Sequence, residues 1–329
     1  MRRRYLSWLS VFAMLSALCS APLLAQTVAS TEPANKPTGK PLTLALNWKA
    51  EPQFGGFYAA QVQGHYGANG LNVNIVEGGS GTPTIQMLLA GKVDYAIVSA
   101  DEAVIALGRG ASDIVALFAT YQTNPQGIMT HAARGFSSLE QVMRGDGVLL
   151  WQSGLPYAQY LRKKYAPLTV VTAPYLGGIG NFQNDPKVSQ QCFVTSEPLT
   201  AAAAGVKVKT FLVADSGYNP YTSVMVTRRQ RLDIAPDEVK AMVAAVRGGW
   251  NDYLADPTAT NAAMQALNKA MSAETFAASA QAQRELIKTG STAQVGEMSL
   301  ARWQTLADQL LEIKVIQKPV AVDGLFVNL

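Results

Sequence analysis

The stretch that most constrains the fold is residues 42–82, which predicts a strand, a helix, a second strand and a glycine-rich turn. Apolar runs lie at 42–46 and 71–76, and a helical pattern through Phe57 and Ala60 separates them. A connection of this length between apolar strands predicts a parallel pair with a right-handed helical crossover. The loops after both strands then lie at the carboxyl edge of the sheet, where open α/β sheets bind ligands.

Strand and helix patterns continue to alternate along the chain, and two breaks interrupt them. The breaks lie at 121–127 and 215–220. This alternation predicts the α/β class with a mainly parallel sheet. The block between the breaks indicates a second lobe inserted into the first. We therefore expect lobe 1 at 42–123 and 219–329, and lobe 2 at 124–218.

The first residues are set aside before the fold is considered. Residues 1–25 combine an arginine run, an apolar run and small residues, which is typical of a secretory signal peptide. We expect cleavage near Ala25, with an uncleaved anchor as the alternative. The lipoprotein pattern is poor at Cys19, because a leucine precedes it. Residues 26–41 are polar and rich in Pro, Thr and Ala, and they predict a flexible leader.

Charge and residue composition exclude several classes of partner and of chemical site. Without residues 1–25 the chain has 24 basic and 23 acidic residues, so neither nucleic acid nor an anionic membrane surface is an expected partner. Cys192 is then the only cysteine, which excludes an internal disulfide. His65 and His131 are the only histidines, and we expect structural roles for both. No spacing of ligands or nucleophiles predicts a metal, a cofactor or a catalytic step.

Two loops of the first lobe are candidates for binding a small, flat, polar molecule. Trp48 follows the first strand, where its ring would either stack on a ligand or pack in the core. The glycine turn would present backbone N–H groups to a carboxylate, phosphate or carbonyl oxygen, or would simply allow a sharp bend. The turn residues expected to bind are Gly79, Ser80, Gly81 and Thr82.

Further candidates follow other predicted strands. Ser99 and Asp101 would offer a hydroxyl and a carboxylate, or cap the helix that begins there. In the second lobe, Trp151 and Gln152 close one strand. Glu197 follows another, where it would bind a ligand or cap the next helix.

Several motifs carry a family resemblance when they are taken in order. They are Asn47-Trp48, Gly56-x-Tyr58, GGSGT, GKVDYAIVSADE, an SEP before an alanine-rich helix, and GYNPYTSVMVTRR followed by IAPDEVKAMVAAVRGGWNDYLADP. The chain resembles the periplasmic substrate-binding proteins of ABC importers over nearly all of residues 42–313. The most similar branch takes up thiamine pyrimidine precursors (the NMT-like branch), with nitrate, sulfonate and taurine binders as relatives.

The resemblance implies a type II periplasmic-binding-protein fold, with two α/β lobes, a two-stranded hinge and C-terminal helices on the first lobe. It implies that Trp48 stacks on the solute and that Glu197 hydrogen-bonds it. Phe54 stands where pyrimidine-precursor binders have a histidine, so another planar or heterocyclic solute fits equally well. Phe54 and Tyr221, both within the matched region, complete the expected ligand contacts.

The resemblance also implies a function. We expect a non-catalytic, monomeric, periplasmic protein that delivers a small solute to an ABC permease in the inner membrane. A periplasmic sensor domain of the same fold is an alternative. A thiamine pyrimidine biosynthesis enzyme is a weaker one, since Phe54 replaces its histidine and Cys192 stands alone where such enzymes have a cysteine-rich stretch.

Overall fold

The computed structural model describes residues 39–288 and 294–329. The predicted signal peptide, 1–25, and most of the predicted leader lie outside the described residues. In the part of the chain that is described, no helix combines the length and the apolar character needed to cross a membrane.

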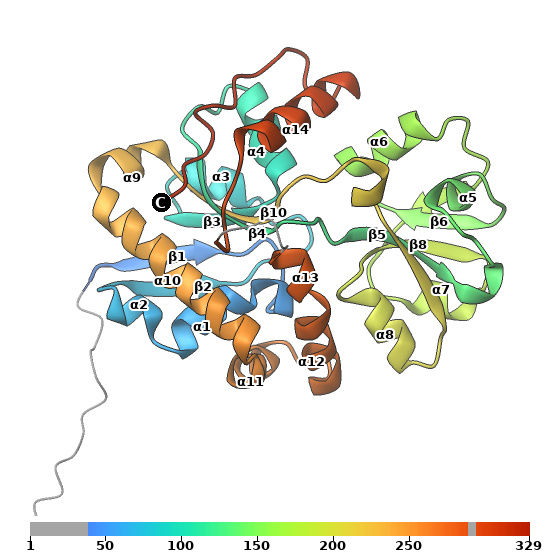
Figure 1. The fold of residues 1–329 in the computed structure, drawn as a ribbon, viewed down its shortest axis with the longest axis horizontal. Coiled ribbons are helices and arrows are strands. Elements are labelled where there is room, and N and C mark those ends of the chain that lie inside the picture. The colour runs from blue at the N-terminus through green and yellow to red at the C-terminus, as the bar shows by residue number, and fades with distance from the viewer. Residues whose placement is uncertain (1–38, 289–293) are drawn as a thin grey trace, which may run out of the picture. The chain divides into compact units, whose positions relative to one another are not determined.

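The first lobe is built on a five-stranded sheet in the order β2-β1-β3-β10-β4, in which β10 alone runs antiparallel to its neighbours (Figure 1). Every residue of β3, β4 and β10 is buried, as expected for central strands with nearly continuous apolar sequence. The strands are β1 Pro41–Ala45, β2 Asn72–Val76, β3 Tyr95–Val98, β4 Val115–Tyr121 and β10 Thr222–Thr227.

Helices from both ends of the described chain belong to this lobe. They are η1 Pro52–Phe54, α1 Gly55–Val62, α2 His65–Ala68, α3 Thr84–Leu89, α4 Ala100–Gly108, α9 Arg229–Ile234, α10 Pro236–Ala255, α11 Thr258–Leu267, α12 Ala273–Ala282, α13 Arg284–Ile287 and α14 Leu300–Glu312. The long helix α10 packs on α1, and α14 packs on α4. The predicted return of the C-terminal helices to the first lobe is thus confirmed.

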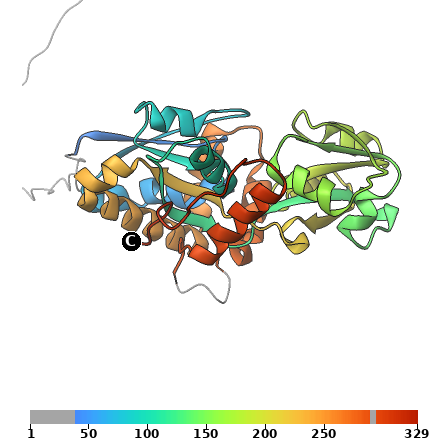
Figure 2. The same ribbon diagram turned by 90° about the horizontal axis from the view of Figure 1, so that it is seen from above.

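The second lobe has its own sheet, in the order β7-β6-β8-β5-β9, with β5 antiparallel to its neighbours. Figure 2 shows its strands gathered together, apart from those of the first sheet. Its elements are β5 Gln126–His131, η2 Ala132–Arg134, α5 Leu139–Met143, β6 Val148–Trp151, α6 Pro156–Lys164, β7 Val171–Pro174, α7 Gly180–Asn184, β8 Val188–Phe193, α8 Glu197–Ala203, β9 Val208–Leu212 and η3 Ala214–Ser216.

Two short segments link the sheets, and their positions determine which sheet edges face each other. Residues 122–125 join the carboxyl end of β4 to β5, which is antiparallel to β8. Residues 213–221 join the carboxyl end of β9 to β10. Both segments therefore leave each sheet at the edge where its parallel strands end. The candidate binding loops of the two lobes follow strands at these facing edges.

A network of polar contacts fixes the two linking segments to each other and to the first lobe. The Asn124 backbone N–H donates to Asn219 Oδ1 at 2.8 Å, and Asn124 Nδ2 donates to the Pro220 carbonyl at 3.0 Å. Arg302, on α14, donates from Nε to the Asn219 carbonyl at 2.9 Å, and its guanidinium lies 3.9 Å from the centroid of the Tyr221 ring. Helix α14 thus holds the junction between the lobes.

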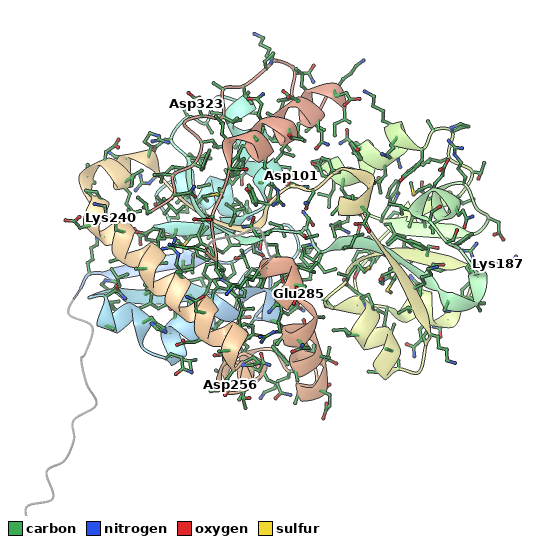
Figure 3. The ribbon with its side chains drawn as sticks, viewed as in Figure 1. Asp101, Lys187, Lys240, Asp256, Glu285 and Asp323 are labelled. Carbon is green, nitrogen blue, oxygen red and sulfur yellow. The ribbon has the colours of Figure 1, made fainter. Side chains whose placement is uncertain are left out.

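Glycines bring α1 and α10 unusually close. A Cβ at Gly56 would lie 2.1 Å from the Trp250 ring, and a Cβ at Gly249 would lie 2.2 Å from the Gly56 carbonyl oxygen. Lys240, in the early part of α10, and Asp256, just past its end, mark the course of this helix in Figure 3. This contact fixes the start of α1, which only η1 separates from the loop that carries Trp48.

Candidate ligand-binding site

The loop after β1 presents Trp48 at the carboxyl edge of the first sheet. The indole is half-buried and packs on the first-lobe core. Its Nε1 donates a hydrogen bond to Glu51 Oε1 at 3.1 Å. The Gly78 N–H donates to the Trp48 carbonyl at 3.0 Å, and the Ala50 N–H donates to Glu77 Oε2 at 3.3 Å. These two hydrogen bonds join the Trp48 loop to the segment directly after β2.

Glu51 was not predicted as a site residue, although it stands three residues after Trp48 and directly before Pro52. Its pKa is raised from 4.5 to about 7, mainly by burial and to a smaller extent by the charge of Glu197 in the second lobe. The Trp48 hydrogen bond and the charge of Lys49 act in the opposite direction without offsetting burial. Glu51 is therefore a carboxyl group that titrates near neutral pH.

This titration predicts a pH-dependent effect of Glu51→Gln on stability. Because the folded pKa lies above the ordinary value, the stability is highest with Glu51 protonated and falls as pH rises from about 4.5 through 7. Glutamine removes this loss, so the free energy of unfolding at pH 8 should rise by at most about 3 kcal/mol. Urea unfolding at pH 4.5 and pH 8 checks this, and an equal change at both pH values would contradict it.

Glu197 lies at the carboxyl edge of the second sheet, in the first turn of α8. Its Oε2 accepts the Phe193 N–H at 2.8 Å, and its Oε1 accepts the Tyr175 O–H at 3.2 Å. Burial raises the pKa of its carboxyl group, while these hydrogen bonds lower it. Tyr175, which follows β7, was not predicted as a site residue. Its position after a strand that ends at this edge was the available signal.

A hollow of about 350 Å³ lies at the same edge of the second lobe. It is lined by residues 151–155, from the end of β6 onward, and 172–175 around the end of β7, so Tyr175 connects it to Glu197. The predicted residue Gln152 lies in this lining. Its side chain accepts from Gln191 Nε2 at 2.9 Å, and its backbone N–H donates to Gln191 Oε1 at 2.5 Å. This exchange orients the amide group of Gln152.

Contacts with α12 bring the two edges together. Element η1, which begins directly after Glu51, and α8, which begins at Glu197, both pack on α12. The Thr195 side chain lies beside the Tyr121 hydroxyl, which donates to Gln283 Oε1 at 2.6 Å. The charge of Glu197 acts on Glu51 across this junction. Helix α12 thus contacts both the element that follows Glu51 in one lobe and the helix that begins at Glu197 in the other.

Several backbone N–H groups of the glycine turn are already hydrogen-bonded within the protein and are not free to bind a ligand. The Gly78 N–H binds the Trp48 carbonyl, the Gly79 N–H binds Thr82 Oγ1 at 2.8 Å, and the Thr82 N–H binds the Gly79 carbonyl. A Cβ at Gly78 would lie 2.2 Å from the Leu46 carbonyl oxygen, so glycine is needed there for close approach. Ser80 and Gly81 remain exposed. Their contact with a ligand stays a prediction.

Ser99 has the capping role that was considered as an alternative. Its hydroxyl accepts the Glu102 N–H, and the Glu102 carboxylate accepts the Ser99 N–H at 2.8 Å. Asp101, at the start of α4 in Figure 3, accepts a hydrogen bond from the Ser99 hydroxyl and another from the Tyr218 O–H at 3.2 Å. Burial raises the pKa of Asp101. Asp101 thus connects α4 to the second linking segment, and its contact with a solute stays a prediction.

Two residues predicted to contact the ligand, Phe54 and Tyr221, have side chains that lie in the core, and their contact with a solute stays a prediction. Phe54 is 1% exposed and packs in the first-lobe cluster. Tyr221 is 3% exposed, lies against Trp303 and is covered by the Arg302 guanidinium. Trp151 is also buried, although it is among the residues that line the hollow.

The two histidines and Cys192 were expected to have no role in ligand binding, and their contacts are as follows. His65 Nε2 lies 2.6 Å from Asp252 Oδ2 on α10, and His131 Nε2 lies 2.7 Å from the Phe182 carbonyl. Cys192 is buried, and burial raises the pKa of its thiol well above the ordinary value. Within residues 39–288 and 294–329, no group of His, Cys, Asp and Glu side chains is arranged to hold a metal ion.

The chain matches one protein family over more than half of its length. The family described as NMT1/THI5 like matches residues 51–163 and 185–260, which together exceed half of the chain. The chain belongs to the NMT1/THI5-like family. No curated protein matches its sequence.

Solved structures share the fold of this NMT1/THI5-like protein. The periplasmic aliphatic sulphonate binding protein SsuA from Escherichia coli is 12% identical, with a TM-score of 0.69 over 89% of this chain and 94% of that one. A Candida albicans gene product with the generic periplasmic binding protein fold is 18% identical, with a TM-score of 0.58 over 88% and 97%. The desulfurization enzyme DSZB is 13% identical, with a TM-score of 0.61 over 87% and 96%. The predicted fold is confirmed, and it occurs in both binding proteins and an enzyme.

Proposed function

We propose that this NMT1/THI5-like protein is the extracytoplasmic solute-binding component of an ABC importer. It binds a small planar or heterocyclic solute between its two lobes and makes or breaks no bond in it. The observation that carries this proposal is that the element directly after Glu51 in one lobe, η1, and the helix that begins at Glu197 in the other, α8, both pack on α12. Half of such a site lies on each lobe, so the bound solute stabilises their approach by its contacts with both.

The chemistry of the site supports binding. The half-buried indole offers a flat apolar surface, and a stacked ring contributes about 0.5 to 1.5 kcal/mol beyond its buried area. The carboxylates of Glu51 and Glu197 are oriented by N–H and O–H donors, which prepares them to accept hydrogen bonds from a solute. A micromolar dissociation constant requires only about 8 kcal/mol net.

Thermal-shift screening tests this function. The panel contains vitamin precursors, pyrimidines, purines, flavins and sulfonates. A solute at 100 times its dissociation constant adds about 2.7 kcal/mol. In a protein of this size that raises the melting temperature by roughly 4 °C. Stabilisation by one solute class without turnover supports the proposal, whereas chemical conversion of the solute, or no shift with any class, contradicts it.

Glu197→Gln is expected to weaken a solute that donates an N–H group by about tenfold, because a hydrogen bond to a charged acceptor is worth roughly 1.5 to 3 kcal/mol. Glutamine keeps the shape of the side chain but not its charge. Titration calorimetry with the stabilising solute measures the change. Glu140→Gln, on the surface of the same lobe, is the matched control. Equal affinities of the Glu197 variant and wild type would remove Glu197 from the site.

The proposal includes the partner and the compartment. Solute binding of this kind serves an inner-membrane ABC permease, and the protein would act in the periplasm as a monomer. Co-purification with a membrane permease encoded beside this gene would support the importer, whereas co-purification with a sensor kinase would support the regulatory alternative.

A further inference from the structure

The hollow of the second lobe has a lining without charged side chains. In the described parts of the chain, neither a lysine, an arginine nor a carboxylate lines it. A charged group that entered the hollow would therefore lose hydration without gaining a counter-charge. The polar side chains of the lining are neutral, and they are Gln152, Ser153, Thr172 and Tyr175.

A buried contact fixes the orientation of one of these groups, the Gln152 amide. Gln191 is 7% exposed, and its Oε1 accepts the Gln152 backbone N–H at 2.5 Å and the Tyr157 O–H at 2.8 Å. Because a backbone N–H can only donate, this atom of Gln191 must be the oxygen. Its Nε2 therefore donates to the side-chain oxygen of Gln152, at 2.9 Å.

The other atom of the Gln152 amide is a free donor. Its Oε1 is bonded to Gln191, and its Nε2 has no hydrogen-bond partner among the residues that the structure describes. Gln152 is exposed and lines the hollow, so its N–H groups are available to a molecule there. A side chain that is oriented before binding loses little conformational freedom when a ligand bonds to it.

We propose that the hollow receives an uncharged, hydrogen-bond-accepting group of the solute, such as a carbonyl oxygen or a ring nitrogen, to which Gln152 Nε2 donates. Gln191 and Tyr157 are positioning residues, because they set the direction of the Gln152 amide and act on the solute through it. This inference rests on the proposed solute-binding function and names the class of group that the second lobe selects. An N–H donor in the same place would meet another N–H donor.

Three flat probes of similar size test which group is selected. Acetophenone offers a neutral acceptor, aniline offers N–H donors, and benzoate offers a charged acceptor. Each is titrated into the isotope-labelled protein at pH 8, and the side-chain NH₂ signals of Gln152 are followed by NMR. Acetophenone should shift these signals and bind about tenfold more tightly than aniline or benzoate. Unshifted signals with acetophenone, or aniline or benzoate binding as tightly, would overturn the inference.

Gln191→Glu is the variant that separates positioning from a structural role. The glutamate keeps an acceptor for the Gln152 N–H and for the Tyr157 O–H, but it has no N–H to donate. The Gln152 amide should therefore turn over, so that its Nε2 bonds to the new carboxylate and its Oε1 faces the hollow. Aniline should then bind about tenfold more tightly than acetophenone. Equal weakening of both probes would contradict the positioning role.

Gln191→Met tests the same point without adding a buried charge. Methionine keeps the length of the side chain but removes both amide atoms, so the Gln152 amide becomes free to rotate. The preference for acetophenone over aniline should fall from about tenfold to about twofold. A full preference that persists in this variant would show that Gln191 does not set the direction of the Gln152 amide.

Gln190→Glu is the matched control for the glutamate substitution. Gln190 is 1% exposed in the same strand, β8, and its Nε2 donates to the Gly178 carbonyl at 3.0 Å. Successive side chains of a strand point to opposite faces of the sheet, so Gln190 faces away from Gln191 and its partners. This variant should keep the preference for acetophenone, and its reversal here would contradict the assignment. Melting temperatures show that each variant is folded.

The inference and the proposed function fail in different ways. A panel solute that stabilises the protein but leaves the Gln152 signals unchanged would show that the inference is wrong while the binding function stands. A panel solute that shifts these signals and binds about tenfold more weakly to Gln152→Glu supports both. If no panel solute stabilises the protein, the proposed function itself fails.

Discussion

Trp48→Ala is expected to weaken solute binding by about 30-fold or more while leaving the protein folded. Truncating a central aromatic contact at a binding site typically costs 2 kcal/mol or more, which corresponds to that factor. The indole is half-buried rather than enclosed, so little core packing is lost with it. Titration calorimetry with the solute identified by thermal shift measures the affinity, and the melting temperature of the unliganded variant measures stability.

Trp250→Ala is the control for this substitution. Trp250 is fully buried between α10 and α1, where it meets Phe57 and Tyr253 edge-on. Removing a buried tryptophan typically costs about 3 to 5 kcal/mol. The two variants should therefore separate binding from stability. A loss of stability in Trp48→Ala as large as that in Trp250→Ala would assign the indole to the core and end its role as a ligand contact.

Gly249→Ala is expected to lower the free energy of unfolding by about 3 kcal/mol, an unusually large cost for one added methyl group. The new Cβ would lie 2.2 Å from the Gly56 carbonyl oxygen and 2.5 Å from the Ala60 backbone nitrogen. These are backbone atoms of α1, which cannot rotate away as a side chain can, so the two helices must separate. Alanine favours the helix by only about 1 kcal/mol over glycine, which does not offset the clash.

Gly67→Ala provides the matched glycine control. Gly67 lies in α2, where a Cβ would meet no atom within 4 Å. The same substitution there should leave the free energy of unfolding unchanged or raise it by up to about 1 kcal/mol. Urea unfolding of both variants measures the difference. Equal stabilities of the two variants would show that α1 and α10 separate at no cost.

The fold was predictable because its signals are local. The apolar runs that formed β1 and β2 and the helical pattern through Phe57 each depend on a few consecutive residues. The breaks in the alternation fall at the segments that link the two sheets. Helix α7 was missed because Gly180–Asn184 contains a glycine and two asparagines and has no apolar period.

The site was predicted less completely. Trp48 and Glu197 lie at the carboxyl edges of their sheets as expected, and their contact with a solute stays a prediction. Phe54 and Tyr221 were assigned by their position in motifs, and position along the chain does not say which face of an element is covered. Glu51 and Tyr175 were missed because their importance comes from contacts with Trp48 and Glu197.

The pattern of apolar residues was enough to predict the class of fold, most of the strands and helices, and the edge at which binding loops would lie. These follow from the period of apolar residues, which each segment carries alone. Which side chains are enclosed, and how far the pKa of Glu51 is shifted, depend instead on tertiary packing. Burial and the approach of Glu197 raise the pKa of Glu51, and both arise only when segments far apart in the chain pack on α12.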